Sequence, residues 1–197
     1  VRVGEVAITR SEYYENEDCA MMQCLDDRIG CMIIIDSILR DVKNTNDMEY
    51  VFTGQEEIGC FGAQTSTFDL QPDLFVTFDV TSTGDELRGF RTDVKLGGGA
   101  GIKVMDYFMI VNQYVVDALV DVAEKNGIKY QIEVSEHGGT DAHTAQLVRG
   151  GMKAGAITIP TRNIHSRDEI ICKEDVLDCI RMAMALETAE LDEHFGA

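Results

Sequence analysis

The chain alternates between segments with apolar residues at helical spacing and short apolar runs typical of strands. Helical spacing predicts helices over residues 26–44, 109–127, 140–150 and 172–191. Asp26 or Asp27 is suited to cap the first turn of the first helix, and Thr140 opens the third. The second helix is amphipathic and ends at Gly127, a residue suited to the left-handed conformation after a helix C-terminus.

Short runs with β-branched and aromatic residues predict the strands, which lie over residues 1–9, 48–54, 72–80, 128–134 and 153–160. An acidic connector over 10–24 follows the first strand. Residues 81–108 are the least regular region and are expected to form loops or a short hairpin. The run KLGGGAG within it lacks the Lys-Ser/Thr of a P-loop and is interpreted as a flexible turn.

The alternation of strands and helices predicts the fold class. Buried, β-branched strands between helices indicate an α/β fold with three layers, in which helices cover both faces of a mostly parallel, mixed sheet. In such sheets, ligands bind beyond the carboxyl ends of the strands.

Composition narrows the classes of protein that the chain can represent. With 197 residues and 45% hydrophobic content, the chain is long enough for one well-buried core. Its 35 acidic residues against 17 Lys and Arg give a formal charge of -18, which repels phosphate backbones, so nucleic acid is not an expected partner. The same charge attracts metal ions and amines. No run of about 18 apolar residues occurs, so no membrane-spanning helix is expected.

The cysteines and the first residue bear on cellular location. Six cysteines without a C-x-x-C pair are interpreted as scattered, mostly buried thiols of a reducing compartment, which predicts a cytoplasmic protein. Because the chain begins at Val1, it is interpreted as a processed product or a piece of something longer, and a signal peptide outside the printed sequence stays open.

Residues that bind metals gather near the predicted junctions between elements. Glu56 and Glu57 follow one strand, Asp79 follows the next, His165 comes shortly after a third, and Asp26 opens a helix. Carboxylates and imidazole are ligands that zinc accepts. A centre with two metal ions also needs a separate carboxylate to take a proton from water, and Glu56 is left for that role. A cation on Glu57 would make its repulsion with Glu56 tolerable.

A structural interpretation of the same residues stays open at this point. Adjacent glutamates are common on exposed turns, and an Asp pair at the start of a helix is often a cap that interacts with the helix dipole. A histidine beside a serine is often a hydrogen-bonded surface residue.

Five motifs together resemble a known family. LDDRIG, GQEEIGCFGA, PDLFVTFDVTSTGDE, GGTDAHTAQLVRGG and ITIPTRNIHSRDE occur in the order found in the TET-type dinuclear-metal aminopeptidases. That family includes glutamyl and deblocking aminopeptidases, and its members are sometimes labelled cellulase or endoglucanase. The resemblance covers nearly the whole chain and implies a zinc-peptidase-like fold.

The resemblance implies a role for each residue of the constellation. Asp26 matches the carboxylate that bridges both metal ions, and Glu56 matches the general base. Glu57 and His165 match further ligands of one metal, and Asp79 matches a ligand of the other. One more residue, in the GGTDA motif, matches a substrate-side or outer-shell position: Asp141.

The chain departs from the family pattern on its upstream side. The family's remaining ligand is a histidine in an H-x-D motif, which does not occur here, and all four histidines follow the glutamate pair. Residues 1–20 resemble the tail of an inserted dimerisation domain and its connector, and 21–197 resemble a catalytic domain that is incomplete on its N-terminal side. The resemblance implies two divalent ions, zinc or cobalt, in the complete enzyme and one in this chain.

The predicted function is the metal-dependent removal of N-terminal residues from peptides, by a protein that forms homo-oligomers in its complete form. A different class stays open: a non-catalytic fragment or pseudoenzyme that keeps one metal and acts in binding or assembly. Glycoside hydrolysis is disfavoured because sugar clefts are usually lined with aromatics, whereas this chain has no Trp and 7% aromatic residues.

Overall fold

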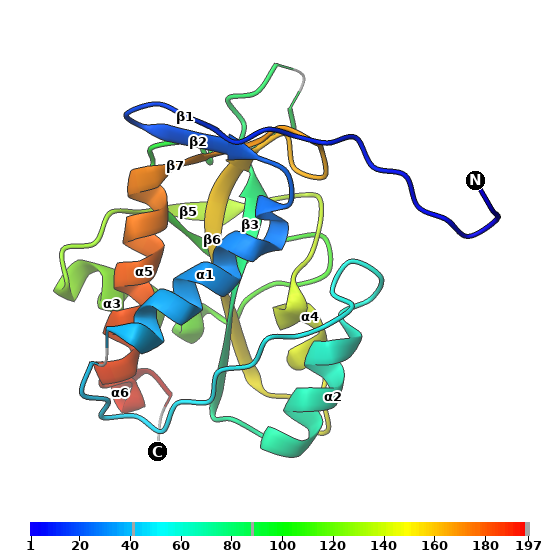
Figure 1. Cartoon of the computed structure of the whole chain (residues 1–197). Helices are drawn as coiled ribbons and strands as arrows, with labels where there is room; N and C mark the ends of the chain where they lie inside the picture. The colour runs from blue at the N-terminus through cyan, green and yellow to red at the C-terminus, as the bar shows by residue number, and fades with distance from the viewer. Residues whose placement is uncertain (41, 88, 196–197) are drawn as a thin grey trace.

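Seven strands form one mixed sheet in the computed structural model, which describes residues 1–40, 42–87 and 89–195 (Figure 1). The strands are β1 (Tyr14–Glu15), β2 (Cys19–Met22), β3 (Leu74–Ser82), β4 (Ala100–Met105), β5 (Tyr130–Val134), β6 (Lys153–Arg162) and β7 (Glu169–Cys172). Their order is β1-β2-β7-β6-β4-β5, and β3 pairs with β6. The two longest ladders, β3 with β6 and β4 with β5, are parallel, and the remaining pairs are antiparallel.

The helices are α1 (Leu25–Leu39), α2 (Phe61–Leu70), α3 (Gln113–Lys125), α4 (Asp141–Ala145), α5 (Lys173–Thr188) and α6 (Asp192–Phe195). Helix α5 packs against α1 and α3, whereas α2 and α4 form a separate pair at the lower right of Figure 1, where α4 also contacts β3 and β6. Five fully buried side chains illustrate the core that joins the helices to the sheet: Ile33, Ile102, Leu119, Ile157 and Ile159. Each contributes about 1.5–3 kcal/mol through burial.

The four predicted helices are present, with shorter bounds. After α3, the amide of Ile128 donates to the Ala123 carbonyl at 2.9 Å, and Gly127 adopts φ 62°, as in the predicted C-terminal cap. Thr140 precedes α4, which ends after five residues. Helices α2 and α6 were not predicted.

Two predicted strands are wrong. Residues 1–13 run away from the sheet as an irregular arm (Figure 1), with the apolar side chains of Val1, Val3, Val6 and Ile8 exposed. Residues 48–54 are also not a strand, and they pair with no strand in the described part of the chain. An apolar run without a neighbouring strand cannot satisfy its backbone in a sheet.

Strand β4 lies inside the region expected to be loops or a short hairpin. Its Lys103 is 3% exposed, and the ammonium lies 2.6 Å from the carboxylate of Glu133 on β5. The preceding glycine run is a turn, but it is held in place: the amides of Gly97 and Gly99 each donate to the Asp175 carboxylate at 2.7 Å. The connector over 10–24 likewise contains β1 and β2.

The segment before the glutamate pair is tied to the end of α5. Glu187 is 2% exposed and accepts hydrogen bonds from the hydroxyls of Ser37 and Tyr50, the latter at 2.8 Å. The Asn46 side chain donates to the carbonyls of Leu186 and Ala189, both at 3.0 Å. Burial and the neighbouring Glu187 raise the pKa of Tyr50 to about 12, so its hydroxyl stays a donor at neutral pH.

No helix among the described residues combines the length and the apolar character needed to cross a bilayer.

Candidate metal centre

Three of the predicted ligands converge at one point. The Nε2 atom of His165 lies 3.1 Å from a carboxylate oxygen of Asp26 and 3.2 Å from one of Glu57. A tetrahedral zinc ion with bonds of about 2.0–2.1 Å separates its ligand atoms by about 3.3 Å, which is close to both of these distances. All three donor atoms lie within 4.8 Å of one another, so the group could hold one ion. The side chain of His165 is 68% exposed and that of Asp26 only 11%, so the group opens toward solvent on one side.

The start of α1 places Asp26. Both Asp26 and Asp27 have non-helical backbone angles, and the Asp27 carboxylate accepts the amide of Gly30 at 3.0 Å, which caps the regular part of the helix. A Cβ atom at Gly30 would lie 2.3 Å from this carboxylate, so glycine gives the cap its space. The prediction that one of the two aspartates caps the helix is confirmed for Asp27.

Glu169, which was not predicted, ties two of the ligands together. One of its carboxylate oxygens accepts the amide of Asp26 at 3.1 Å, and the other accepts the amide of His165 at 2.9 Å. Glu169 is 2% exposed. His165 has a backbone φ of 60°, an uncommon conformation for a residue with a side chain. The hydrogen bond that the His165 amide donates to Glu169 stabilises that conformation. The sequence shows an acid four residues after His165, but not its contact with Asp26.

The glutamate pair lies on a closed loop before α2. The amide of Gly62 donates to the Gly54 carbonyl at 3.0 Å, and the amide of Cys60 donates to the Glu56 carbonyl at 2.9 Å. Burial raises the pKa of Glu56, and repulsion by Asp141 adds to the increase, although a hydrogen bond from Cys60 opposes it. Glu56 is therefore a half-buried carboxylate of increased basicity beside the three converging ligands.

Asp79 lies near this centre without joining the three donors. It is 7% exposed within β3, which continues to Ser82, and one carboxylate oxygen accepts the Val80 amide at 2.8 Å. Burial raises its pKa well above the ordinary value, and repulsion by Asp27 and Glu56 adds to the increase. Within the described part of the chain, no group of three close metal donors includes Asp79.

The acidic cluster is unfavourable without a cation. Burial followed by repulsion from Glu57 raises the pKa of Asp26 to about 6, and burial followed by repulsion from Asp26 raises that of Asp27 to about 8, against a hydrogen bond from Gly30 that lowers it. A divalent cation would favour the charged carboxylates.

Asp141 opens α4 on the other side of Glu56. It is 5% exposed, and one of its carboxylate oxygens accepts the hydroxyl of Thr53 at 2.5 Å. Donor atoms of Asp141, Glu56 and Cys60 all lie within 4.8 Å of one another. Its predicted role toward the substrate stays a prediction.

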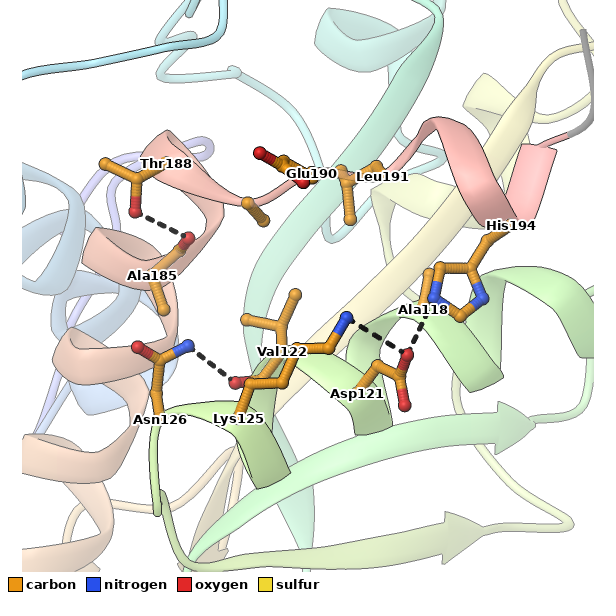
Figure 2. Close-up of a pocket in the computed structure, with 11 residues that line it drawn as sticks. Ala118, Asp121, Val122, Lys125, Asn126, Ala185, Thr188, Glu190, Leu191 and His194 are labelled. Atoms are coloured by element: carbon orange, nitrogen blue, oxygen red, sulfur yellow. Dashed lines mark hydrogen bonds and ion pairs between the residues drawn. The ribbon is translucent and has the colours of Figure 1, made fainter.

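A cavity of about 320 Å³ opens over the three ligands and is lined also by Cys24 and Arg167. A second cavity, of about 370 Å³, lies between α3, α5 and α6 (Figure 2). There His194 contacts Asp121 at 2.9 Å, and Lys125 lies 3.5 Å from the same aspartate. None of the predicted site residues lines this second cavity.

Known proteins match nearly the whole chain. The family described as M42 glutamyl aminopeptidase matches residues 1–182. A protein of Acetivibrio thermocellus that carries an aminopeptidase name is 37% identical over 182 residues, which are 92% of this chain and 55% of that protein. The predicted family resemblance is thereby confirmed.

Solved structures match the fold. Aminopeptidase APDkam598 from Desulfurococcus kamchatkensis superposes with a TM-score of 0.91 at 33% identity, covering 99% of this chain and 56% of that chain. The Pyrococcus horikoshii TET1 peptidase, which can assemble into a tetrahedron or a large octahedral shell, has a TM-score of 0.82 at 28% identity, covering 93% of this chain and 54% of that one. The α/β fold with a mixed sheet is confirmed, and the chain spans about half the length of these relatives.

Proposed function

The chain belongs to the M42 glutamyl aminopeptidase family, and from this premise we propose that it forms a large part of the active site of a metal-dependent aminopeptidase. The observation that best supports this is the position of His165, whose Nε2 atom lies 3.1 Å from Asp26 and 3.2 Å from Glu57, the residue next to Glu56. The substrate would be a peptide with a free N-terminus, whose ammonium group suits an acidic cleft.

Two divalent ions, zinc or cobalt, would be held by this acidic cluster in the complete protein. Asp26, Glu57 and His165 would hold one ion. Asp26 and Asp79 would contribute to the other, whose set of ligands would be completed outside this chain. Bound ions supply Lewis acidity that polarises a peptide carbonyl and lowers the pKa of water.

Glu56 would act as the general base. Its half-buried carboxylate would accept a proton from the attacking water and deliver that proton to the leaving amine. The raised pKa of Glu56, caused first by burial, brings the group closer to neutral pH, where both transfers can occur.

The substitution Glu56→Gln tests this assignment. Hydrolysis of amino-acid p-nitroanilides by the full-length protein should fall about 10²-fold or more, while bound metal measured by elemental analysis stays unchanged. Glu57→Gln is the matched control, because it should lose metal as well as activity. Unchanged hydrolysis in Glu56→Gln would contradict the base assignment.

A non-catalytic role is the second candidate. It is favoured by the position of Asp79, which lies outside the three-donor group among the described residues, and by the lack of an H-x-D motif. The chain would then keep one metal and act in binding or assembly. One metal per chain without any hydrolysis by the full-length protein would select this candidate.

Assembly, domain organisation and location complete the proposal. The shells formed by the TET1 peptidase support a homo-oligomer. Residues 1–20 would be the tail of an inserted dimerisation domain and its connector, and 21–197 the catalytic domain. The six free cysteines suit the reducing conditions of the cytoplasm.

A further inference from the structure

The glutamate pair faces donor atoms on both of its sides. Glu57 points toward Asp26 and His165, whereas Glu56 lies with Cys60 and Asp141, all of whose donor atoms are within 4.8 Å of one another. We propose that Glu56, Cys60 and Asp141 form an additional cation site that binds a thiophilic divalent ion such as zinc. This site is separate from the two metal positions of the proposed peptidase centre.

The distances suit a metal with mixed sulfur and oxygen ligands. The Sγ atom of Cys60 lies 3.5 Å from a carboxylate oxygen of Glu56. Tetrahedral zinc with a sulfur at about 2.3 Å and an oxygen at about 2.0 Å places those two atoms about 3.5 Å apart. Cys60 directly precedes α2 and Asp141 opens α4, and these two helices pack on each other, so the donors are on supported positions.

Asp141 provides a second observation that indicates a bound cation. Its exposed fraction is only 5%, and one of its carboxylate oxygens accepts a hydrogen bond from the Thr53 hydroxyl. The other oxygen, Oδ1, is buried without a hydrogen-bond partner among the residues that the structure describes. A buried acceptor without a partner costs about 1–3 kcal/mol, and a cation beside Cys60 and Glu56 would remove that cost.

The neighbouring imidazole does not take the place of the ion. The Nδ1 atom of His143 lies 2.7 Å from the Thr140 carbonyl and 3.9 Å from the Cys60 sulfur, while its Nε2 atom lies 3.0 Å from the Thr144 hydroxyl. The carbonyl contact requires a proton on Nδ1, so both ring nitrogens already have partners. The thiol proton would pass to solvent when the ion binds the thiolate.

Occupancy of this site would inhibit the peptidase, a consequence that depends on the proposed role of Glu56 as base. An ion held by the Glu56 carboxylate would block the oxygen that must accept a proton from water. Zinc would therefore support hydrolysis at low concentration through the peptidase centre and suppress it at higher concentration through Cys60.

A cobalt titration of the metal-depleted chain tests the site independently of activity. Co²⁺ bound to a thiolate gives a sulfur-to-metal charge-transfer band in the near ultraviolet. We expect the wild-type band to be lost in Cys60→Ser and retained in His165→Ala. Cys24→Ser is the matched thiol control, because Cys24 lines the cavity over the other centre and its loss should leave the band intact. No wild-type band, or a band that depends on Cys24, would overturn the proposal.

A second variant guards against loss of fold. Asp141→Asn keeps the shape of the side chain and should weaken Co²⁺ binding at least about 10-fold, the size of effect found even for outer-shell partners. Thermal melting without metal identifies any variant that has lost its structure. If Cys60→Ser is unfolded, the test relies on Asp141→Asn instead. Unchanged affinity in a folded Asp141→Asn chain would overturn the site.

Inhibition separates this proposal from the proposed function. A band that depends on Cys60 supports the site even if the protein hydrolyses no peptide. In an active full-length protein, excess zinc should inhibit the wild type more strongly than Cys60→Ser. Equal inhibition would overturn the link between this site and Glu56.

Discussion

Glu169 shows how a single buried carboxylate can position two residues of a candidate metal centre. Its two oxygens accept amides from residues on separate segments, Asp26 and His165, which are two of the converging ligands. Neither ligand side chain is contacted through these bonds. Glu169 therefore acts on the backbone: it fixes the separation between the main chain at Asp26 and the main chain at His165, from which the two ligand side chains extend.

Glu169→Gln should lower zinc affinity about 10–100-fold. The amide side chain keeps one acceptor but turns an NH₂ group toward one of the two backbone amides, so Asp26 or His165 loses its support. A chelator-competition titration would measure this. Asp168→Asn is the matched control, because it removes the same charge from an exposed neighbour. An equal loss of zinc affinity in both variants would show that Glu169 affects metal binding only through its charge.

At the scale of single residues, the sequence indicates which side chains could bind metal, but not every contact between them. Asp26, Glu57 and His165 could be proposed because each lies at a junction between predicted elements. Glu169 and Asp141 contribute through contacts with Asp26 and Thr53, which lie 143 and 88 residues away along the chain. Such contacts leave no local pattern in the sequence.

The loop over 54–62 is the element that carries the glutamate pair. Its ends meet where α2 begins, and the space there is small: a Cβ atom at Gly62 would lie 2.5 Å from both the nitrogen and the oxygen of Gly54. These are backbone atoms, which cannot turn aside as a flexible side chain can.

Gly62→Ala should therefore open this loop. We expect the free energy of unfolding to fall by about 1–3 kcal/mol, the usual cost of inserting a methyl group into packed structure, and zinc affinity to fall with it. Chemical denaturation and a zinc titration would measure the two effects. The control is Gly150→Ala, where a Cβ atom meets nothing within 4 Å, so stability should be nearly unchanged. A Gly62→Ala chain as stable as this control would contradict the packing argument.

Elements were predicted well where local pattern and tertiary contacts agree. Helix α3 and strand β6 show clear periodicity or a clear apolar run, and both are present. Strand β4 was missed because it begins beside a glycine run and contains Lys103, whose charge is balanced by Glu133 on another strand. The segment over 48–54 has a strand-like pattern but no adjacent strand among the described residues.

At the scale of the whole molecule, charge links metal binding to stability. The chain has a formal charge of -18, and the carboxyl groups of Asp26 and Asp27 on α1 and of Asp79 on β3 repel one another. The raised pKa values of Asp26 and Asp27 mean that folding opposes their ionisation, first through burial and then through repulsion. A bound cation reverses this penalty.

Metal removal by a chelator should lower the melting temperature. Zinc at a hundred times its dissociation constant contributes about 2.7 kcal/mol, which corresponds to a shift on the order of 5–10 °C for a chain of this length. Differential scanning calorimetry would measure the shift, and His165→Ala should show a smaller one. Identical melting with and without zinc would contradict the proposed centre.

The pH dependence of the metal-free chain has a defined sign. The folded chain keeps a proton on Asp27 up to about pH 8, whereas the ordinary value is 3.8. The folded state thus binds more protons, so this contribution to stability is complete below pH 3.8 and is lost as pH rises through 8. The stabilisation by zinc should be larger at pH 8 than at pH 6.

The tie between Glu187 and the segment before the glutamate pair has a consequence for biosynthesis. Tyr50 and Asn46 are held by α5, through contacts that span 137 to 143 residues. A ribosome adding about 5–20 residues per second needs roughly 7 to 30 s to make that interval. For most of this time the nascent chain already contains Glu56 and Glu57, but not the helix that holds the segment before them. The candidate metal centre therefore gains this support only after α5 has been synthesised.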